Sequence, residues 1–353
     1  MAGCERRFLE LSKRLAKRNH EVHVYTVRYD KRLPKEEVIN GVFIHRCAYS
    51  NRYLSTWNFR SLDGVLKYSL STLVQLSEQN FDVYYSNQWP MIHSFFAKPF
   101  ASPLIQEWCE VWYKPLKVML LQHLLKKFGD YHVAVSEFTK QRLLNFLGLD
   151  KNKVATIPNG VDNSKFHCNP NKKIWGRIIY VGRLVPHKHV GLLVDAYRIV
   201  KEKIPEAELH IVGSGPSMQI IKNKASRIKG CFIYGFLPDD QMVKLLESAW
   251  LFVSASEREG SGIAFLEAMA AGIPFITVNY PDNAAKKITR FKCGLAVNPL
   301  SESISSAIIR LLKSEELWKM MSRKALDLAK SHDWNIIADH MDKFLRSVAN
   351  KWL

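Results

Sequence analysis

The sequence predicts an α/β protein with two domains, each built around a parallel sheet. Short β-rich runs alternate with longer amphipathic runs along all 353 residues, which is typical of parallel α/β units. This length suffices for two ordinary domains, and the 47% hydrophobic content is that of a globular protein. A polar segment at residues 159–173, rich in Asn, Lys and turn formers, separates two series of strands. We therefore expect one domain at residues 1–160 and another at residues 174–332.

The expected strands fall on both sides of that polar segment. The first series comprises residues 21–27, 41–47, 82–86, 103–108, 131–136 and 153–158. The second series comprises residues 177–182, 207–213, 231–235, 251–256 and 274–278. Sheets of this kind bind ligands beyond the carboxyl ends of their strands, so the turns that follow strands are the first candidates for a site. Gly-bearing turns follow four strands of the second series, at residues 182–188, 213–216, 235 and 259–262.

The most informative turn lies in residues 256–274, SEREGSGIAFLEAMAAGIP, where Glu259 and Glu267 stand eight positions apart around a Gly-Ser-Gly turn that opens a helix. Gly260 and Gly262 let the backbone approach a ligand, and the free N–H groups of the first helical turn favour an anion such as a phosphate. Eight helical positions span roughly 12 Å, so the two carboxylates can hold opposite ends of one hydroxyl-rich molecule. In the alternative, Glu259 only stabilises the helix dipole and Glu267 is a solvated helix residue.

Two cations follow the first strand of the second series. In VGRLVPHKHV, Arg183 and Lys188 stand five apart across a tight turn that contains a proline, so both can reach one diphosphate. The alternative is two solvated surface charges.

Together these motifs resemble the E-x7-E and G-R-L-x-x-x-K elements of retaining glycosyltransferases of family 4. That family has the GT-B architecture, in which two Rossmann-like domains with parallel sheets face each other across a cleft. The resemblance implies that Arg183 and Lys188 neutralise the leaving diphosphate, Glu259 lies beside the donor sugar and Glu267 binds the ribose. It implies further donor-binding positions at Gly182, Gly213, Gly215, Gly235, Phe236, Leu237, Gly260, Ser261, Gly262 and Ile263. The loop NYPDNAAKKI, which departs from the family pattern, is expected to select the donor sugar.

The resemblance is looser in the first domain. Family members have a strand before the turn and helix that GCERRFLELSKRLAKRNHEVHVYT resembles, whereas Met1 here stands almost at that turn. We expect either a first domain without its first strand or a start of the protein further upstream. Cys109 occupies the place where a family histidine lies near the donor sugar, and His93 is an alternative that is more often structural. A C-terminal helix at residues 333–350 is expected to pack back on the first domain.

The net charge of the chain limits the classes of partner that are expected. The net charge of +18 favours anionic partners, but it is spread evenly, with 24 basic and 15 acidic residues in 1–165 and 27 and 18 in the remainder. Without a basic tail or a recognisable module, nucleic acid is not an expected partner. The helix predicted at residues 114–127 has an apolar face framed by lysines, which suits an anionic membrane, although a core helix with solvated lysines fits as well.

The leading interpretation is a retaining transferase that moves a sugar from a UDP- or GDP-sugar to a glycan or a lipid-linked acceptor. No cofactor or metal is expected, because no motif of paired aspartates for a divalent metal is evident between strands. With no long apolar run, and with six scattered cysteines, we expect a cytoplasmic protein that associates peripherally with the membrane. The alternative is a GT-B-like protein that binds nucleotide sugar without catalysis, as a partner subunit.

Overall fold

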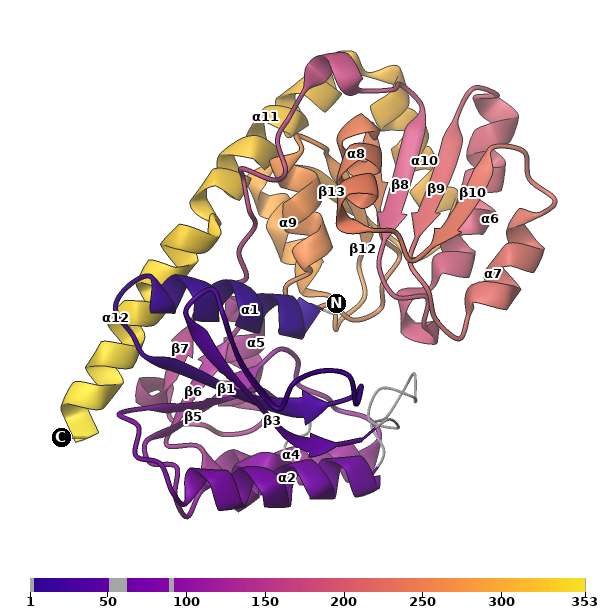
Figure 1. Ribbon diagram of the computed structural model, residues 1–353. Helices are drawn as coiled ribbons and strands as arrows, with labels where there is room; N and C mark the ends of the chain where they lie inside the picture. The colour runs from indigo at the N-terminus through magenta and orange to yellow at the C-terminus, as the bar shows by residue number, and fades with distance from the viewer. Residues whose placement is uncertain (1–2, 51–61, 89–91, 353) are drawn as a thin grey trace. The chain divides into compact units, whose positions relative to one another are not determined.

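The computed structural model describes residues 3–50, 62–88 and 92–352, which form two compact units (Figure 1). Unit 1 contains the chain up to Asn159 together with the last helix, from Trp334 onward. Unit 2 contains Gly160–Asp333. Both are α/β with mainly parallel sheets, so the predicted fold class is confirmed at this level.

Unit 2 has a six-stranded parallel sheet in the order β10-β9-β8-β11-β12-β13. Runs such as RIIYV, LFV and FITV are mostly apolar because both faces of the sheet are covered by helices. The strands are β8 (Arg177–Val181), β9 (Glu208–Val212), β10 (Cys231–Gly235), β11 (Leu251–Val253), β12 (Phe275–Val278) and β13 (Gly294–Val297).

The helices of unit 2 form two hydrophobic layers, one on each face of this sheet (Figure 1). Alternate residues of β8 show the division, since Ile178 and Tyr180 join the layer of α6, α7 and α10, whereas Ile179 joins the layer of α8 and α9. Helix α11 contributes to both layers. The helices are α6 (Val190–Lys203), α7 (Met218–Ala225), α8 (Asp239–Ser248), α9 (Ile263–Ala270), α10 (Ser301–Lys313) and α11 (Glu315–Ser331), with 3-10 turns η3 (Pro170–Lys172), η4 (Pro186–Lys188) and η5 (Ala284–Phe291).

The described strands of unit 1 form two smaller sheets. One has the order β1-β3-β2 and the other the order β4-β5-β6-β7. The strands are β1 (Val22–Arg28), β2 (Glu36–Ile39), β3 (Val42–Tyr49), β4 (Tyr84–Ser86), β5 (Leu104–Trp108), β6 (Tyr131–Ala134) and β7 (Val154–Thr156). The helices are α1 (Gly3–Ala16), α2 (Leu62–Leu76), α3 (Ile92–Ala97), α4 (Leu116–Leu125), α5 (Glu137–Asn145) and α12 (Trp334–Trp352), with 3-10 turns η1 (Lys126–Phe128) and η2 (Lys151–Lys153).

Two strands were not predicted from the sequence. Strand β2 pairs antiparallel with β3 through a turn at Asn40 and Gly41, both with positive φ, which is the Asn-Gly signal of a two-residue hairpin. Strand β13 follows Lys292, whose left-handed conformation ends η5. The predicted helix cap at Ser136 is confirmed, because its hydroxyl accepts a hydrogen bond from the Thr139 N–H at 3.1 Å.

Helix α12 packs against α1 within unit 1. The Arg18 guanidinium contacts the Asp339 carboxylate at 2.6 Å, and Arg14 donates to the Asn335 side chain at 3.0 Å. The His20 imidazole pairs with Asp342 one turn further along. These contacts join residues more than 300 positions apart in sequence, so the two ends of the described chain belong to one unit.

Candidate functional site

The Gly-bearing turns of unit 2 lie side by side at the carboxyl edge of its sheet. The Gly182 N–H donates to the Val212 carbonyl at 3.0 Å, and the Leu184 N–H donates to the Ser214 carbonyl at 2.9 Å. The Gly213 N–H in turn donates to the Gly235 carbonyl at 2.7 Å. Main-chain hydrogen bonds therefore join the turns that follow β8, β9 and β10 into one surface.

Two glycines of this surface have no room for a side chain. A Cβ on Gly213 would lie 1.8 Å from the Gly182 carbonyl oxygen. A Cβ on Gly215 would lie 2.2 Å from the Leu184 carbonyl oxygen. Both distances are far below van der Waals contact, so the glycines are required by the close approach of two backbones.

Lys188 and Glu259 meet beside these turns. The Lys188 ammonium lies 2.6 Å from the Glu259 carboxylate, and the two side chains are only 14% and 13% exposed. The loops that carry them are tied together, because the Glu257 N–H donates to the His187 carbonyl at 2.8 Å. The structure thus pairs a predicted cation with a predicted carboxylate, which sequence spacing did not indicate.

Asn283 anchors the Glu259 loop from the other side. Its buried amide nitrogen lies 2.9 Å from the Val278 carbonyl and 3.1 Å from the Ser256 carbonyl. The Glu259 main chain donates to the Asp282 carbonyl at 3.1 Å and accepts from the Ala284 N–H at 2.8 Å. The loop predicted to select the donor sugar therefore lies directly against Glu259. The bracing role of Asn283 has no sequence signal, because most of its partners are main-chain atoms and the remaining one is the Thr277 hydroxyl, 2.9 Å away.

A cluster of positive charge surrounds His187. Burial lowers the pKa of His187 to about 3, and the charges of Lys188, Arg258 and Arg183 act in the same direction. His187 is therefore neutral at physiological pH, and the surrounding potential favours an anion. Within residues 3–50, 62–88 and 92–352, the exposed Arg183 guanidinium makes no hydrogen bond or ion pair, whereas Lys188 is paired.

Helix α9 begins at this site. Gly262, with a φ of 60°, precedes the first helical residue, Ile263, and Gly260 and Ser261 are half-buried. Phe265 packs edge-on against Phe252, which holds the helix on the sheet. Glu267 is only 4% exposed. The interpretation of Glu267 as a solvated helix residue is therefore wrong, because α9 is buried from Phe265 to its last residue, Ala270.

The last predicted donor-binding segment follows β10. Gly235 is buried with a φ of 70°, a conformation that glycine adopts without strain. Phe236 next to it is 71% exposed, and Leu237 packs against the α8–α9 layer. The segment therefore presents an exposed ring and main-chain groups beside the Gly213 turn.

Known proteins match both halves of the chain. The family model described as Glycosyltransferase Family 4 matches residues 1–165, and the model described as Glycosyl transferases group 1 matches residues 168–327. The chain belongs to the family 4 glycosyltransferases. The family, and with it an enzyme class, is thus confirmed.

Individual relatives agree with this assignment. An uncharacterised glycosyltransferase of Methanocaldococcus jannaschii is 28% identical over 93% of this chain and 90% of its own length. The poly(glycerol-phosphate) alpha-glucosyltransferase of Bacillus subtilis is 31% identical over 44% of this chain, and the match spans only 24% of that protein. The crystal structure of Anabaena HepE in complex with UDP and glucose has a TM-score of 0.79 and 15% identity over 98% of this chain and 96% of its own, a likeness of fold. The GT-B class of two Rossmann-like units is thereby confirmed.

In unit 1 of this family 4 chain, Cys109 lies in a buried polar network. Its Sγ is 3.0 Å from the Cys4 Sγ, and its N–H donates to the Gln88 side-chain oxygen at 3.0 Å. The hydrogen bond with Cys4 and burial raise the pKa of the Cys109 thiol. The His93 ring lies 6.1 Å from that of Tyr68.

A buried ion pair next to Cys109 was missed from the sequence. The Arg7 guanidinium of α1 lies 2.6 Å from the Glu107 carboxylate of β5, and both side chains are inaccessible to solvent. Arg7 also donates to the main-chain carbonyls of Ile157 and Pro158, and the Tyr85 hydroxyl donates to Glu107 at 2.5 Å. The charges are 100 residues apart in sequence, so no local pattern indicates the pair.

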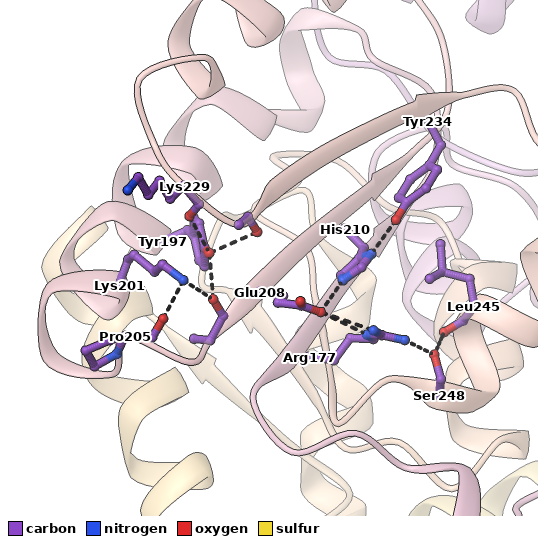
Figure 2. Close-up of polar contacts among 12 residues, drawn as sticks. Arg177, Tyr197, Lys201, Pro205, Glu208, His210, Lys229, Tyr234, Leu245 and Ser248 are labelled. Atoms are coloured by element: carbon purple, nitrogen blue, oxygen red, sulfur yellow. Dashed lines mark hydrogen bonds and ion pairs between the residues drawn. The ribbon is translucent and has the colours of Figure 1, made fainter.

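A second polar cluster of unit 2 starts at the opposite edge of the sheet and reaches Tyr234 of β10 (Figure 2). Glu208 begins β9 and contacts both Arg177, which begins β8, and His210, each at 3.1 Å. The other ring nitrogen of His210 contacts the Tyr234 hydroxyl at 2.8 Å. Because Arg177 and Glu208, the charged members of this cluster, stand at the amino ends of their strands, we assign the cluster a structural role.

Among the residues that the structure describes, no three His, Cys, Asp or Glu side chains gather in a way that could hold a metal ion. In the same residues, no helix combines the length and apolar character that crossing a bilayer requires.

Proposed function

We propose that the chain is a retaining glycosyltransferase that moves a sugar from a UDP- or GDP-sugar to a glycan or lipid-linked acceptor. The observation that carries the proposal is the Lys188–Glu259 pair, set among Gly-bearing turns at the carboxyl edge of the unit 2 sheet. Cations, main-chain N–H groups and a carboxylate gather where such sheets bind ligands. The names of the relatives, an alpha-glucosyltransferase and a protein crystallised with UDP and glucose, support the same choice.

The proposed chemistry places the cations at the leaving group. The bond between the anomeric carbon and the diphosphate oxygen breaks, and its electrons leave with the diphosphate. Arg183 and Lys188 stabilise the charge that grows there, which is the largest contribution such groups make to catalysis. Lys188 then shares its ammonium between the diphosphate and Glu259, and Glu259 accepts hydrogen bonds from the sugar hydroxyls. The acceptor hydroxyl bonds to the anomeric carbon on the face that the diphosphate leaves, and its proton passes to the leaving oxygen.

In this proposal the nucleotide occupies the remaining turns at the carboxyl edge of the unit 2 sheet. The buried Glu267 carboxylate accepts from the ribose hydroxyls, and the first N–H groups of α9, from Gly262 onward, hold the diphosphate. The base lies on Gly235–Leu237, with Phe236 as an exposed ring for stacking. Protein cations, and no divalent metal, offset the diphosphate charge in this proposal.

The second candidate is a protein that binds a nucleotide sugar without transferring it. The observation that favours it is Cys109, a half-buried thiol at the position of a family histidine. The two candidates share the donor site, so binding alone does not separate them. A purified chain that binds donor but neither hydrolyses nor transfers the sugar would support the second candidate.

The first experiment is thermal stabilisation by UDP, GDP and ADP and by their sugar conjugates, with and without EDTA. We expect one base to stabilise the chain selectively, and the shift to persist in EDTA. Glu267→Gln should abolish the shift, whereas Lys224→Met, at an exposed ion pair on α7, should leave it intact. No shift with any nucleotide would contradict the donor site. Once a donor is found, NMR of the product reports whether the anomeric configuration is retained.

The proposed setting is the cytoplasm, with peripheral association at an anionic membrane. A nucleotide-sugar donor and a lipid-linked acceptor would meet at that surface.

A further inference from the structure

Two helices of unit 1 carry matching apolar stripes that face solvent. Helix α4 exposes Leu116, Leu120 and Leu124, and helix α2 exposes Leu66, Leu70 and Val74. Each stripe repeats every four residues, so it runs along one side of its helix. The six side chains are between 42% and 62% exposed. Six large apolar side chains in two rows are more than the scattered hydrophobic residues of an ordinary surface.

Helix α3 joins the two stripes. It packs against both α2 and α4, and it adds Phe95, with Phe100 just beyond its end, as further exposed rings. A pocket of about 350 Å³ opens among α2, α3 and η1, and it is lined by Leu73, Phe95, Phe96, Lys98, Pro99 and Phe128. Phe95 meets Phe128 edge-on at 5.1 Å, which makes the lining continuous between α3 and the end of α4. We call this surface the α2–α4 face.

The opposite side of α2 shows that the stripe is not a misplaced core. Val65 and Leu76 are buried, and the helix packs on β1 and β3. In α4, Val118, Gln122 and Leu125 are buried instead. The side-chain amide of Gln122 both donates to and accepts from the Trp112 main chain, which fixes the rotation of α4. Each helix therefore has its own inward face, and the leucine stripes remain as a second apolar face.

The charges beside the α4 stripe are all positive. Residues 111–128 contain four lysines and no acidic residue. Lys114, Lys117 and Lys127 are exposed, whereas the Lys126 ammonium is bound to the Leu147 carbonyl. A second copy on this face would bring the same lysines together, which is unfavourable, while an anionic lipid surface neutralises them.

We infer that the α2–α4 face binds a bilayer that contains anionic lipid. The leucine stripes and Phe95 enter the boundary between headgroups and acyl chains, and the lysines contact lipid phosphates. Helix α4 is only 10 residues long, so it lies in the plane of the surface. The pocket beside Phe95 receives an acyl chain. This inference extends the proposed function by fixing which surface meets the membrane, and it depends on no donor-site residue.

The test is flotation of the full chain with two kinds of vesicle, one of phosphatidylcholine alone and one in which phosphatidylglycerol is one lipid in three. We expect binding to the anionic vesicles and at least about tenfold weaker binding to the neutral ones, because each lysine near the surface contributes to the attraction. The same preference should decrease as salt is raised. Absence of binding to both vesicles would overturn the inference.

Variants distinguish membrane binding through the α2–α4 face from nonspecific binding by exposed apolar side chains elsewhere. Replacing Leu116, Leu120 and Leu124 together by Gln should weaken binding to anionic vesicles by about tenfold or more, because the buried apolar area is lost. The matched control is Ile220→Gln on α7 of unit 2, where the side chain is 71% exposed, and it should bind like the wild type. Since every replaced side chain is exposed, circular dichroism should be unchanged. Equal binding by the triple variant and the wild type would overturn the inference.

Two further readouts distinguish the remaining outcomes. If the wild type elutes as a dimer and the triple variant as a monomer, the face joins two copies and the membrane inference is wrong. The nucleotide-induced thermal shift, measured without vesicles, should be the same in the triple variant and the wild type. If the wild type binds vesicles but shows no nucleotide-induced shift, only the proposed function is contradicted. If it shows the shift but does not bind vesicles, only this inference is contradicted.

Discussion

The two units hold their buried polar groups by different means. In unit 2, main-chain hydrogen bonds connect the turns after β8 and β9, and Gly213 and Gly215 lie against neighbouring carbonyls. In unit 1, the corresponding edge after β5 is held by side chains, with Arg7 bonded to Glu107 and to the Ile157 carbonyl. The comparison shows that a site made of backbone leaves glycines in the sequence. A network of distant side chains leaves no such mark.

The largest expected effect comes from breaking the side-chain network of unit 1. Glu107→Gln should lower the free energy of unfolding by about 3–5 kcal/mol, because it leaves the Arg7 charge buried and uncompensated. Urea unfolding, monitored through hydrogen exchange of unit 1 amides, measures this loss of stability. The control is Lys224→Met, which breaks the exposed pair with Asp195 and should cost less than about 1 kcal/mol. Equal losses in the two variants would show that the buried Arg7–Glu107 pair contributes no more to the free energy of unfolding than an exposed pair.

The next effect concerns the Lys188–Glu259 ion pair beside the backbone surface of unit 2. Lys188→Met should lower turnover roughly 100- to 1,000-fold, because it removes a cation from the proposed leaving group. Steady-state kinetics with the donor found by thermal shift checks this, and Lys224→Met should keep normal turnover. Wild-type turnover in Lys188→Met would contradict the assigned role.

A smaller effect tests whether unit 2 depends on close contact between backbones. Gly213→Ala should destabilise the chain by about 3 kcal/mol, because the new methyl group overlaps the Gly182 carbonyl. Gly191→Ala in α6 has only an ordinary contact with Lys224 and should stabilise by roughly 0.5–1 kcal/mol, as alanine favours a helix. Thermal unfolding of the two variants should therefore shift in opposite directions. Shifts of the same sign would disprove the steric argument.

The smallest effect is a pH dependence in unit 1. The Trp108 N–H donates to His132 Nδ1 at 3.1 Å, so this buried ring must be neutral, and burial lowers its pKa to about 4. Since the ring takes up its proton more readily in the unfolded chain, this stability is present above pH 6.5 and is lost as pH falls toward 4. At pH 5 the expected loss is about 2 kcal/mol.

His132→Gln provides the comparison for that pH dependence. Glutamine keeps an acceptor for Trp108 but does not titrate, so the variant should lose less stability than the wild type between pH 7 and pH 5. Urea midpoints at the two values measure the difference. Parallel loss in both proteins would exclude His132 as the source.

Much of the fold could be predicted from periodicity. The strand runs such as RIIYV and LFV are short, apolar and bounded by turn residues, which predicts buried parallel strands. Strand β2 was missed although Asn40 and Gly41 mark its hairpin, because its own residues, EEVI, are mostly exposed and lack a clear alternation. Strand β13 was missed because GLAV is too short to be distinguished from a loop.

The candidate site could be predicted in part. Its glycines, Arg183, Lys188 and both glutamates stand in recognisable spacing, and the structure brings Lys188 to Glu259. The contributions of Asn283 and Arg7 could not be foreseen. Asn283 binds main-chain carbonyls, which carry no residue identity, and Arg7 pairs with a carboxylate 100 positions away.

The sequence by itself determined the two α/β units, the turns at one sheet edge and the lysine-rich segment at 111–128, because these depend on local composition and spacing. Only the tertiary structure decided that Lys188 pairs with Glu259, that Glu267 is buried, and that α3 packs against both α2 and α4. Those features depend on which distant segments pack together. Packing is set by the complementarity of whole surfaces, which no single stretch of sequence contains.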